Sequence, residues 1–404
     1  MGRHRVLDSA PLYDAVTTMD TVTLVRSALR GLLRVADGEL AEQLRAALTS
    51  GDDYTSAAKP QIDWDDAESR AALIDSRAQD ALACLGVLEG RKLSAELTAA
   101  MQLLASVVGQ DLEQDEDGRW RIARRVARDR VISTVDREAR HGHKTAARGF
   151  DGYKGHVAVD PESELITATA VTPGNVADAS VAAELIGDLL PDAGEQGDTG
   201  APVTTDQAAA EAGPIGEVPV VYGDQAYGTG AFQEQLSEAG ITSRCKTQRP
   251  TAPGGRFPKD RFAIDLEAGA VTCPAGLTVP LQPRRSGERV ARFGASCASC
   301  PRRADCTASA RGRSIHVGVH EASLARARAQ QADPAWRADY RATRPKVERK
   351  LGHLLWRKHG GRHARVRGTE RVDHDFRWLA AAVDLARLAV LGLHWRPTTG
   401  WSAA

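Results

Sequence analysis

Hydrophobic and polar positions along the chain follow two patterns, one with the period of a strand and one with the period of a helix. Short apolar runs bounded by turn residues predict strands over 5–9, 130–135, 152–159, 165–171, 219–224 and 241–246. The strands 152–159 and 165–171 are joined by the turn-like sequence Asp160-Pro161-Glu162-Ser163, so we expect them to form a hairpin. Pro11 is expected to end the first strand.

Helical spacing dominates residues 17–126, which are rich in Ala, Leu and Arg. Asp37 is a suitable N-cap for a helix over 39–48, and residues 81–104 are apolar at helical spacing. Further helices are predicted over 176–190, over 229–239 and from Pro345 onward. Residues 191–219 are rich in Gly, Asp and Pro, so a surface loop is predicted there. This order of elements predicts an α/β fold, a sheet flanked by helices, with a helical insertion after the first strand.

The most apolar run, residues 379–393, is only 15 residues long and carries Asp384 and Arg387, so it is too short and too charged to span a bilayer. We interpret it as a buried helix. Since no apolar stretch follows the basic residues Met1–Arg5, no secretory signal is predicted and we expect a cytoplasmic protein without a membrane partner. The 53 basic and 53 acidic residues balance, so only the distribution of charge can indicate nucleic-acid binding.

Acidic residues stand at the ends of predicted strands. Asp8 and Asp224 each follow an apolar run, and this is where ligands lie in open α/β sheets. Asp136 ends the predicted strand at 130–135 in the same way. Taken singly, such an aspartate is more often a turn former or a helix cap, so the pattern alone leaves both interpretations open.

A third acid, Glu348, lies in a strongly basic stretch. Residues 341–371 contain 11 Lys or Arg and only two acids, Glu348 and Glu370. Such a stretch can neutralise phosphates, and an acid within it could hold a metal ion against one of them. The alternatives are a solvated basic face and a surface pair of Glu348 with Arg344 one turn earlier. The candidate DNA-binding residues are Arg344, Lys350, Lys358, Arg362, Arg365 and Arg367.

Four of the six cysteines cluster in the sequence Cys273-x23-Cys297-x2-Cys300-x5-Cys306. Four thiolates with a Cys-x-x-Cys pair are the usual ligands of a structural zinc ion, so we predict one Zn²⁺ here, in an insertion away from the acids. The alternative is four reduced thiols without metal. Cys84 and Cys245 are interpreted as ordinary buried thiols.

The chain resembles a known family in four segments that occur in the family's order. They are Val6-Leu7-Asp8-Ser9, then Gly152-Tyr153-Lys154-Gly155-His156 with the stretch from Val171 to Asp178, then Gly223-Asp224-Gln225-Ala226-Tyr227-Gly228, and finally Arg344-x-x-x-Glu348. These segments are similar to the successive motifs of bacterial insertion-sequence transposases of the DDE class.

The resemblance implies an RNase H-like mixed sheet flanked by helices, with Asp8, Asp224 and Glu348 as the catalytic, metal-binding triad, and it ranks Asp8 above Asp136. Three carboxylates suit two Mg²⁺ or Mn²⁺ ions. The implied activity is metal-dependent cleavage and strand transfer of double-stranded DNA, both transposon ends and target, and a homodimer on DNA is one arrangement it allows. The expected parts are 1–16, the first catalytic strand; 17–130, a helical insertion; 131–246, the core; 247–330, a zinc-binding insertion; and 331–404, helices that complete the core.

The sequence departs from the family pattern in two places. Family members usually carry a helical DNA-end-binding domain before the first acid, whereas seven residues precede Asp8, so we expect that domain to be missing. The family's lysine seven residues after the glutamate is replaced by Leu355, and Lys350 or Lys358 would have to substitute. Two alternatives remain open: an RNase H-like nuclease that only hydrolyses, and an inactive transposase remnant that binds DNA.

Overall fold

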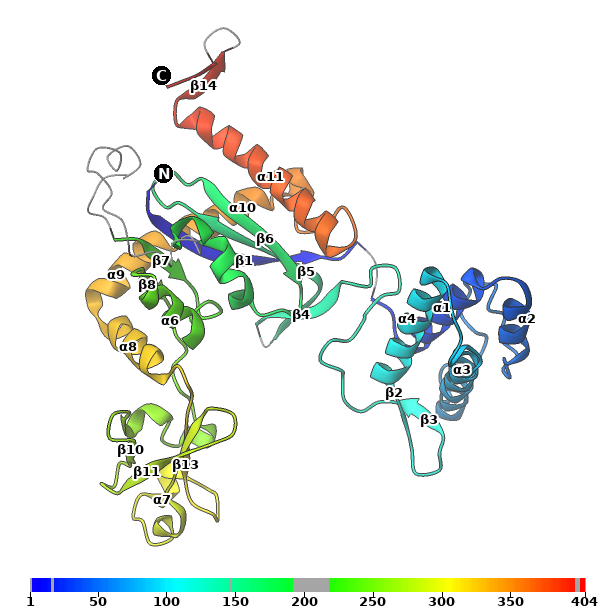
Figure 1. Ribbon diagram of the computed structural model, residues 1–404, viewed down its shortest axis with the longest axis horizontal. Helices are drawn as coiled ribbons and strands as arrows, with labels where there is room; N and C mark the ends of the chain where they lie inside the picture. Colours follow the sequence, from blue (N-terminus) through cyan, green and yellow to red (C-terminus); the bar gives the residue numbers. More distant parts are fainter. Residues whose placement is uncertain (1, 16–17, 146, 192–217, 397–399, 404) are drawn as a thin grey trace, which may run out of the picture.

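A computed structural model describes residues 2–15, 18–145, 147–191, 218–396 and 400–403 of the chain. The loop expected at 191–219 falls almost wholly on residues 192–217, which lie outside the described part. Figure 1 shows three units: a central sheet covered by helices, a helical unit at one end, and a small unit of strands that projects from the central one.

The central sheet is mixed, which confirms the predicted α/β class. Its strands run in the order β4-β5-β1-β7-β8, and β6 pairs with β5. Strand β1 is antiparallel to β5 and parallel to β7, while β5 and β6 form the predicted hairpin. The strands are β1 (His4–Tyr13), β4 (Arg140–Thr145), β5 (Arg148–Val159), β6 (Ile166–Pro173), β7 (Val220–Gly223) and β8 (Thr242–Cys245).

Two strand predictions were wrong. Strand β1 continues through Pro11. Strand β7 pairs with β1 only as far as Val6, so in the described residues no strand pairs with that edge of β1 at Pro11. The missing N–H of the proline therefore costs no hydrogen bond to a neighbouring strand. The segment 130–135 is not a strand at all. Val131 and Ile132 are buried, but the N–H of Val131 is donated to the Gln110 side chain and the carbonyl of Ile132 accepts from the N–H of Met19. These bonds attach the segment to the helical unit instead of the sheet.

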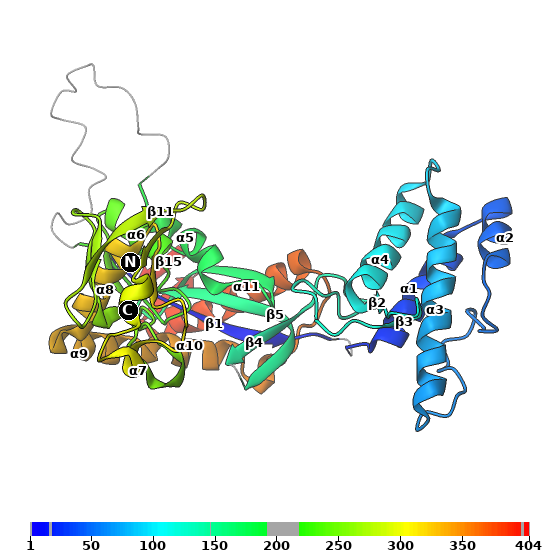
Figure 2. The ribbon, with the colours of Figure 1, turned by 90° about the horizontal axis from the view of Figure 1, so that it is seen from below.

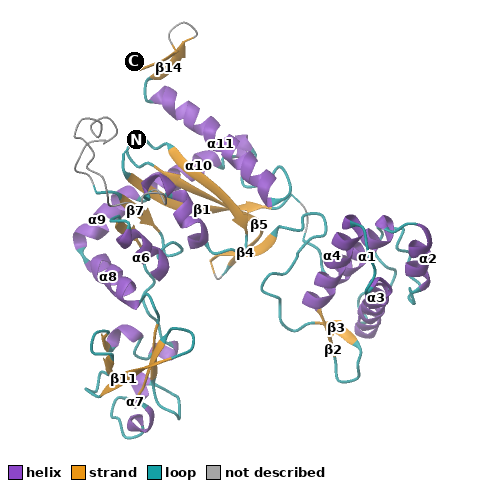
Figure 3. Ribbon diagram, in the orientation of Figure 1, coloured by secondary structure: helices purple, strands orange, loops and turns teal. Residues whose placement is uncertain are grey.

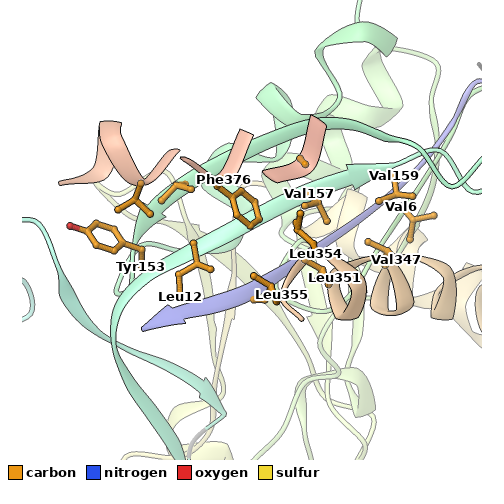
Figure 4. Packing of buried hydrophobic residues seen from close by; sticks show 14 of the residues in the cluster. Val6, Leu12, Tyr153, Val157, Val159, Val347, Leu351, Leu354, Leu355 and Phe376 are labelled. Atoms are coloured by element: carbon orange, nitrogen blue, oxygen red, sulfur yellow. The ribbon is translucent and has the colours of Figure 1, made fainter. Parts of the chain in front are cut away.

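Helices cover both faces of the sheet. On one face lie α10 (Pro345–Leu354) and α11 (Thr369–Val390), and on the other lie α5 (Ala182–Leu185) and α6 (Gly230–Glu238). The strand period of two explains the division, because Val6 and Leu12 of β1 join the core under α10 and α11 while Leu7 joins the opposite core. Figure 4 shows Val347, Leu351 and Leu354 of α10 and Phe376 of α11 over the first of these cores.

The predicted helices of residues 17–126 form a unit with its own core. They are α1 (Thr21–Val35), α2 (Gly38–Ala46), α3 (Ala67–Leu88) and α4 (Ala95–Asp111), followed by the small hairpin of β2 (Leu112–Gln114) and β3 (Trp120–Ile122). The side chains of Asp20, Asp66 and Ser94 cap α1, α3 and α4 by accepting backbone N–H bonds. Figure 2 shows that these helices stand at one end of the molecule, joined to the sheet by extended segments.

A small antiparallel sheet, in the order β13-β12-β11-β10-β9, carries the cysteine cluster. Its elements are β9 (Ala263–Asp265), β10 (Ala270–Thr272), β11 (Thr278–Pro283), β12 (Arg289–Arg292), α7 (Arg303–Cys306) and β13 (Ser314–Val317). The chain then returns to the central unit through α8 (Glu321–Ala332) and α9 (Pro334–Thr343). The His320–Glu234 pair joins the start of α8 to α6. Figure 3 separates this sheet from the helices around it.

The C-terminal part corrects another prediction. Helix α11 contains the apolar run as far as Val390, but its second half is not buried: Leu385 is 57% exposed and Val390 74% exposed. The hairpin of β14 (Leu393–Arg396) and β15 (Gly400–Ala403) follows.

The helix expected over 176–190 is broken into α5 and two short 3-10 helices, Asp178–Val181 and Gly187–Leu189. No helix in the described ranges has the length and apolarity needed to cross a membrane.

Candidate active site

Asp8 lies within β1, and Asp224 directly follows the neighbouring strand β7, which ends at Gly223. Strands β1 and β7 are parallel, with Val6 paired to Tyr222, and each aspartate comes two residues after one of these partners. Because side chains alternate along a strand, each aspartate is expected to point to the face of Val6 and Tyr222, which is the face covered by α10 and α11. The sheet register thus brings together two acids that are far apart in the sequence.

Arg344 connects the two carboxylates. One of its guanidinium nitrogens lies 2.8 Å from an oxygen of Asp8 and 4.0 Å from an oxygen of Asp224. The arginine caps α10 at its junction with α9 and is buried, as is Asp8. Burial by itself lowers the pKa of Arg344, but the attraction of the Asp8 carboxylate outweighs it, and the pKa is raised above its ordinary value. The guanidinium therefore stays charged and holds the two acids close together.

Glu348 lies one helical turn beyond Arg344 and is exposed. It makes no hydrogen bond or ion pair to either aspartate in the described part of the chain. Among the described residues no three His, Cys, Asp or Glu side chains are arranged to hold a metal ion. The carboxylates of Asp8 and Asp224 are adjacent oxygen donors of the kind that divalent cations prefer, and the Arg344 guanidinium balances their charge in this structure. Glu348 lies one turn after Arg344, in α10.

A buried polar network supports β1 behind Asp8. The Ser9 hydroxyl donates to Asp178 at 2.5 Å, and the Lys154 ammonium donates to the same carboxylate at 2.7 Å. Although burial raises the pKa of Asp178, these two donors outweigh it, and the pKa is lowered. Next to them, His156 contacts the Tyr227 hydroxyl at 3.1 Å and the Thr172 hydroxyl at 2.9 Å. This network was not predicted from the sequence, although Lys154 and His156 are polar residues at alternate positions of a largely apolar strand.

Residues 272–389 match the family model of a transposase DDE domain. This match supports a transposase of the DDE superfamily. No curated protein and no solved structure matches the chain. The matched residues include Arg344, Glu348, α8 to α10 and all but the last residue of α11, while Asp8 and Asp224 lie outside them and are brought together by the sheet register.

The basic residues that were predicted to bind DNA separate into buried and exposed groups. Arg344 is engaged with Asp8, and Lys350 is only 3% exposed. Burial lowers the pKa of Lys350, and the carboxylates of Asp384 and Glu164 are near enough to oppose that effect. Neither placement suits a phosphate contact. The side chain of Lys358 lies outside the described part.

The exposed residues Arg362, Arg365 and Arg367 follow α10 in a segment that runs beside the end of β1. The N–H of Tyr13 donates to the Arg362 carbonyl at 2.6 Å, and the N–H of Ala364 donates back to Tyr13 at 2.8 Å. Arg365 is paired with Asp375 at 2.7 Å. Together these three arginines present positive charge at the end of the strand that carries Asp8.

Asp136, the competing first acid, is buried in a structural role. Its carboxylate accepts the Tyr153 hydroxyl at 2.7 Å and the backbone N–H of Gly368 at 3.3 Å. The residue thus ties the loop before β4 to the start of α11.

The four clustered cysteines line one hollow of about 290 Å³ in the small sheet unit. All are free thiols, and Cys306 is buried. Burial raises the pKa of Cys306, and the other three thiols act in the same direction because they lie close to it. The structure therefore gathers the four sulfurs, while no metal-binding arrangement of them is present in the described residues. Cys84 and Cys245 are buried elsewhere, as predicted.

His156 is expected to make stability depend on pH. Its burial lowers the pKa from the ordinary 6.5 to about 4, so the unfolded chain takes up a proton first as the pH falls. The stabilisation is complete above pH 6.5 and is lost between 6.5 and 4, with a total of about 3 kcal/mol. The measurement is urea unfolding of wild type and His156→Gln across this pH range. The difference between their free energies of unfolding should become smaller by that amount as the pH falls from 6.5 to 4. A constant difference would show that His156 does not titrate in this way.

Proposed function

We propose that this transposase cuts and rejoins DNA at a metal-dependent site formed by Asp8 and Asp224, with Glu348 as the third acid, in an RNase H-like core. The observation that carries the proposal is the pairing of β1 with β7, which puts the two aspartates at one level within reach of one guanidinium. The family match covers Glu348 and supports its assignment.

Divalent ions bound at such a site would activate water or a DNA 3′-OH and stabilise the leaving oxygen. Mg²⁺ or Mn²⁺ are the cations that these oxygen donors suit, and Asp8, Asp224 and Glu348 are the residues that would hold them. Arg344 keeps the two aspartates together, and the network of Ser9, Lys154 and Asp178 fixes the strand that carries Asp8.

Double-stranded DNA, both transposon ends and target, is the proposed substrate. The exposed residues Arg362, Arg365 and Arg367 are proposed to contact its phosphates, since they lie beside the end of β1. Because Arg344 and Lys350 are buried, they are assigned to the protein interior in this proposal and not to the DNA surface.

The test compares wild type with Asp8→Asn and Asp224→Asn on duplexes that carry the element's ends, with Mg²⁺. Each change removes a ligating charge with almost no change in volume, so both variants should lose cleavage and strand transfer by on the order of 10²-fold or more. Asp224→Asn should keep the stability of wild type, whereas Asp8→Asn also removes the ion-pair partner of the buried Arg344 and should lower the free energy of unfolding. Products joined to a second duplex distinguish a transposase from a nuclease that only hydrolyses. Full activity of either variant would refute the site, and cleavage without joining would favour the nuclease.

The cysteine cluster is proposed to bind one structural Zn²⁺, which supports the small sheet around it. Its hollow is lined by all four sulfurs, and the usual ligand set of such a site is four thiolates. We expect metal analysis of the purified protein to find one zinc per chain, and Cys300→Ser to lower that content. Because Cys245 is a buried thiol outside the hollow, Cys245→Ser serves as the matched control and should keep the zinc. Zinc-free protein with a stable small sheet would contradict the proposal.

A further inference from the structure

A groove of about 630 Å³ lies between the segment 126–132, which leads from the helical unit to the sheet, and the hairpin of β4 and β5. Among the described residues that line it, Asp151 is the one acid. The basic and histidine side chains of the lining are Arg128, Arg130, Arg140, His141, His143 and Lys154. We call this hollow, with the adjoining hairpin residues Lys144 and Arg148, the basic groove.

Several of these cations are already paired. Arg130 contacts Asp111, Arg140 contacts Asp129, and Lys154 contacts Asp178. Arg128 in the lining and Arg148 on the hairpin are exposed, and neither side chain has a hydrogen bond or ion pair within the described ranges. The groove therefore has positive charge that the protein itself does not neutralise, which is a feature of surfaces that bind polyanions.

The basic groove adjoins β1, the strand that carries Asp8. The Lys144 ammonium donates to the carbonyl of Ser9 at 3.0 Å, one residue after Asp8. Farther along, Lys154 contacts Asp178, and Asp178 accepts the Ser9 hydroxyl. Both contacts link the groove to the strand that carries the first acid.

Close backbone packing fixes the hairpin in this position. Gly152 of β5 has a φ of +136°, which L side chains rarely adopt, and the strand pairs with β4 on one side of this residue and with β6 on the other. A Cβ on Gly142 would lie 2.2 Å from the carbonyl oxygen of Gly174. The hairpin is thus held against the end of β6, and the groove is a preformed surface.

We propose that the basic groove binds the sugar-phosphate backbone of duplex DNA whose strand enters the active site. The inference rests on the proposed function, since it extends the DNA path from Asp8 toward the helical unit. Duplex is favoured over single-stranded DNA because none of the described residues that line the groove is Phe, Tyr or Trp, and single strands are usually held by stacking on such rings. The groove would contribute to the affinity for DNA and not to sequence specificity.

The test uses Arg128→Ala, Lys144→Ala and Arg148→Ala combined in the full chain. Binding to a fluorescent duplex of random sequence is measured without divalent ions over a series of salt concentrations. Because each lost phosphate contact lowers the slope of log K against log salt by about 0.9, the slope should fall by about three units. The matched control combines Arg285→Ala, Arg302→Ala and Arg311→Ala, which removes three exposed arginines of the small sheet unit and should leave the slope unchanged.

Hydrogen exchange gives a second measurement, in which duplex should protect the segments 124–132 and 140–144. An unchanged slope in the groove variant, an equal loss in the control, or tighter binding of single strands would each overturn the inference. Asp224→Asn, assayed in parallel, should bind duplex like wild type and fail to cleave it. Cleavage by that variant would refute the proposed function, whereas an unchanged slope in the groove variant refutes only the groove.

Discussion

Glu348→Gln is expected to lower Mg²⁺-dependent cleavage by on the order of 10² to 10³-fold, the usual effect of removing one preorganised group that stabilises charge at a reacting centre. Glu348 is exposed at the turn after Arg344, so glutamine should fit without disturbing the core. Duplex affinity without metal should stay close to that of wild type, because the change removes no positive charge. Cleavage rates and binding constants, measured on the same preparations, check both parts.

Glu370→Gln is the matched control for this prediction. Glu370 is the other acid of the basic stretch, is also exposed and lies in the first turn of α11. The same loss of charge at that position should leave cleavage within about a factor of a few of wild type, since it removes only a favourable interaction with the helix N-terminus. If Glu348→Gln cleaved at the wild-type rate, Glu348 would be a surface carboxylate and the third acid would have to be sought elsewhere.

The placement of the two aspartates could be predicted from sequence only in part, because the pattern that marks them is local. Asp224 directly follows the end of β7, as its apolar run predicts, whereas Asp8 lies in the middle of β1, which continues to Tyr13. The register of Val6 with Tyr222, which brings the two acids to one level, is not visible in either run. Predicting the neighbour of Asp8 was harder. Arg344 lies 336 positions away in the printed sequence, and its buried contact depends on how α10 packs over β1.

The other wrong predictions share a cause. The periodicity of a segment predicts its own secondary structure but not the element against which it packs. Lys350 looked like a phosphate ligand, but the structure buries it near Asp384 of α11. The apolar end of α11 looked buried, yet its half beyond the sheet has no covering layer in the described ranges, and Val390 is exposed. Ile132 is buried as its apolarity suggests, but its backbone bond goes to Met19 and not to a strand.

Gly228→Ala is expected to lower the free energy of unfolding of the central unit by about 3 kcal/mol, at the upper end of the usual cost of overpacking. Gly228 closes the turn that begins at Asp224, and a Cβ there would lie 1.7 Å from the carbonyl oxygen of Lys246 and 3.1 Å from Cα of Thr247. Backbone atoms cannot rotate aside as a side chain can. The turn or the end of β8 must therefore move, and Asp224 moves with the turn.

The same added methyl group at Gly352 is the control, because nothing lies within 4 Å of its Cβ position in α10. Alanine in that exposed helical position should raise stability by up to about 1 kcal/mol. Urea unfolding is followed for both variants by tryptophan fluorescence, to which the buried Trp336 of the central unit contributes. Without urea, where Gly228→Ala is still folded, the cleavage rate of this variant should also fall. The reason is that the displaced Asp224 is no longer aligned with Asp8. Wild-type stability and activity together in Gly228→Ala would show that the turn tolerates a side chain, and that Gly228 does not set the position of the second acid.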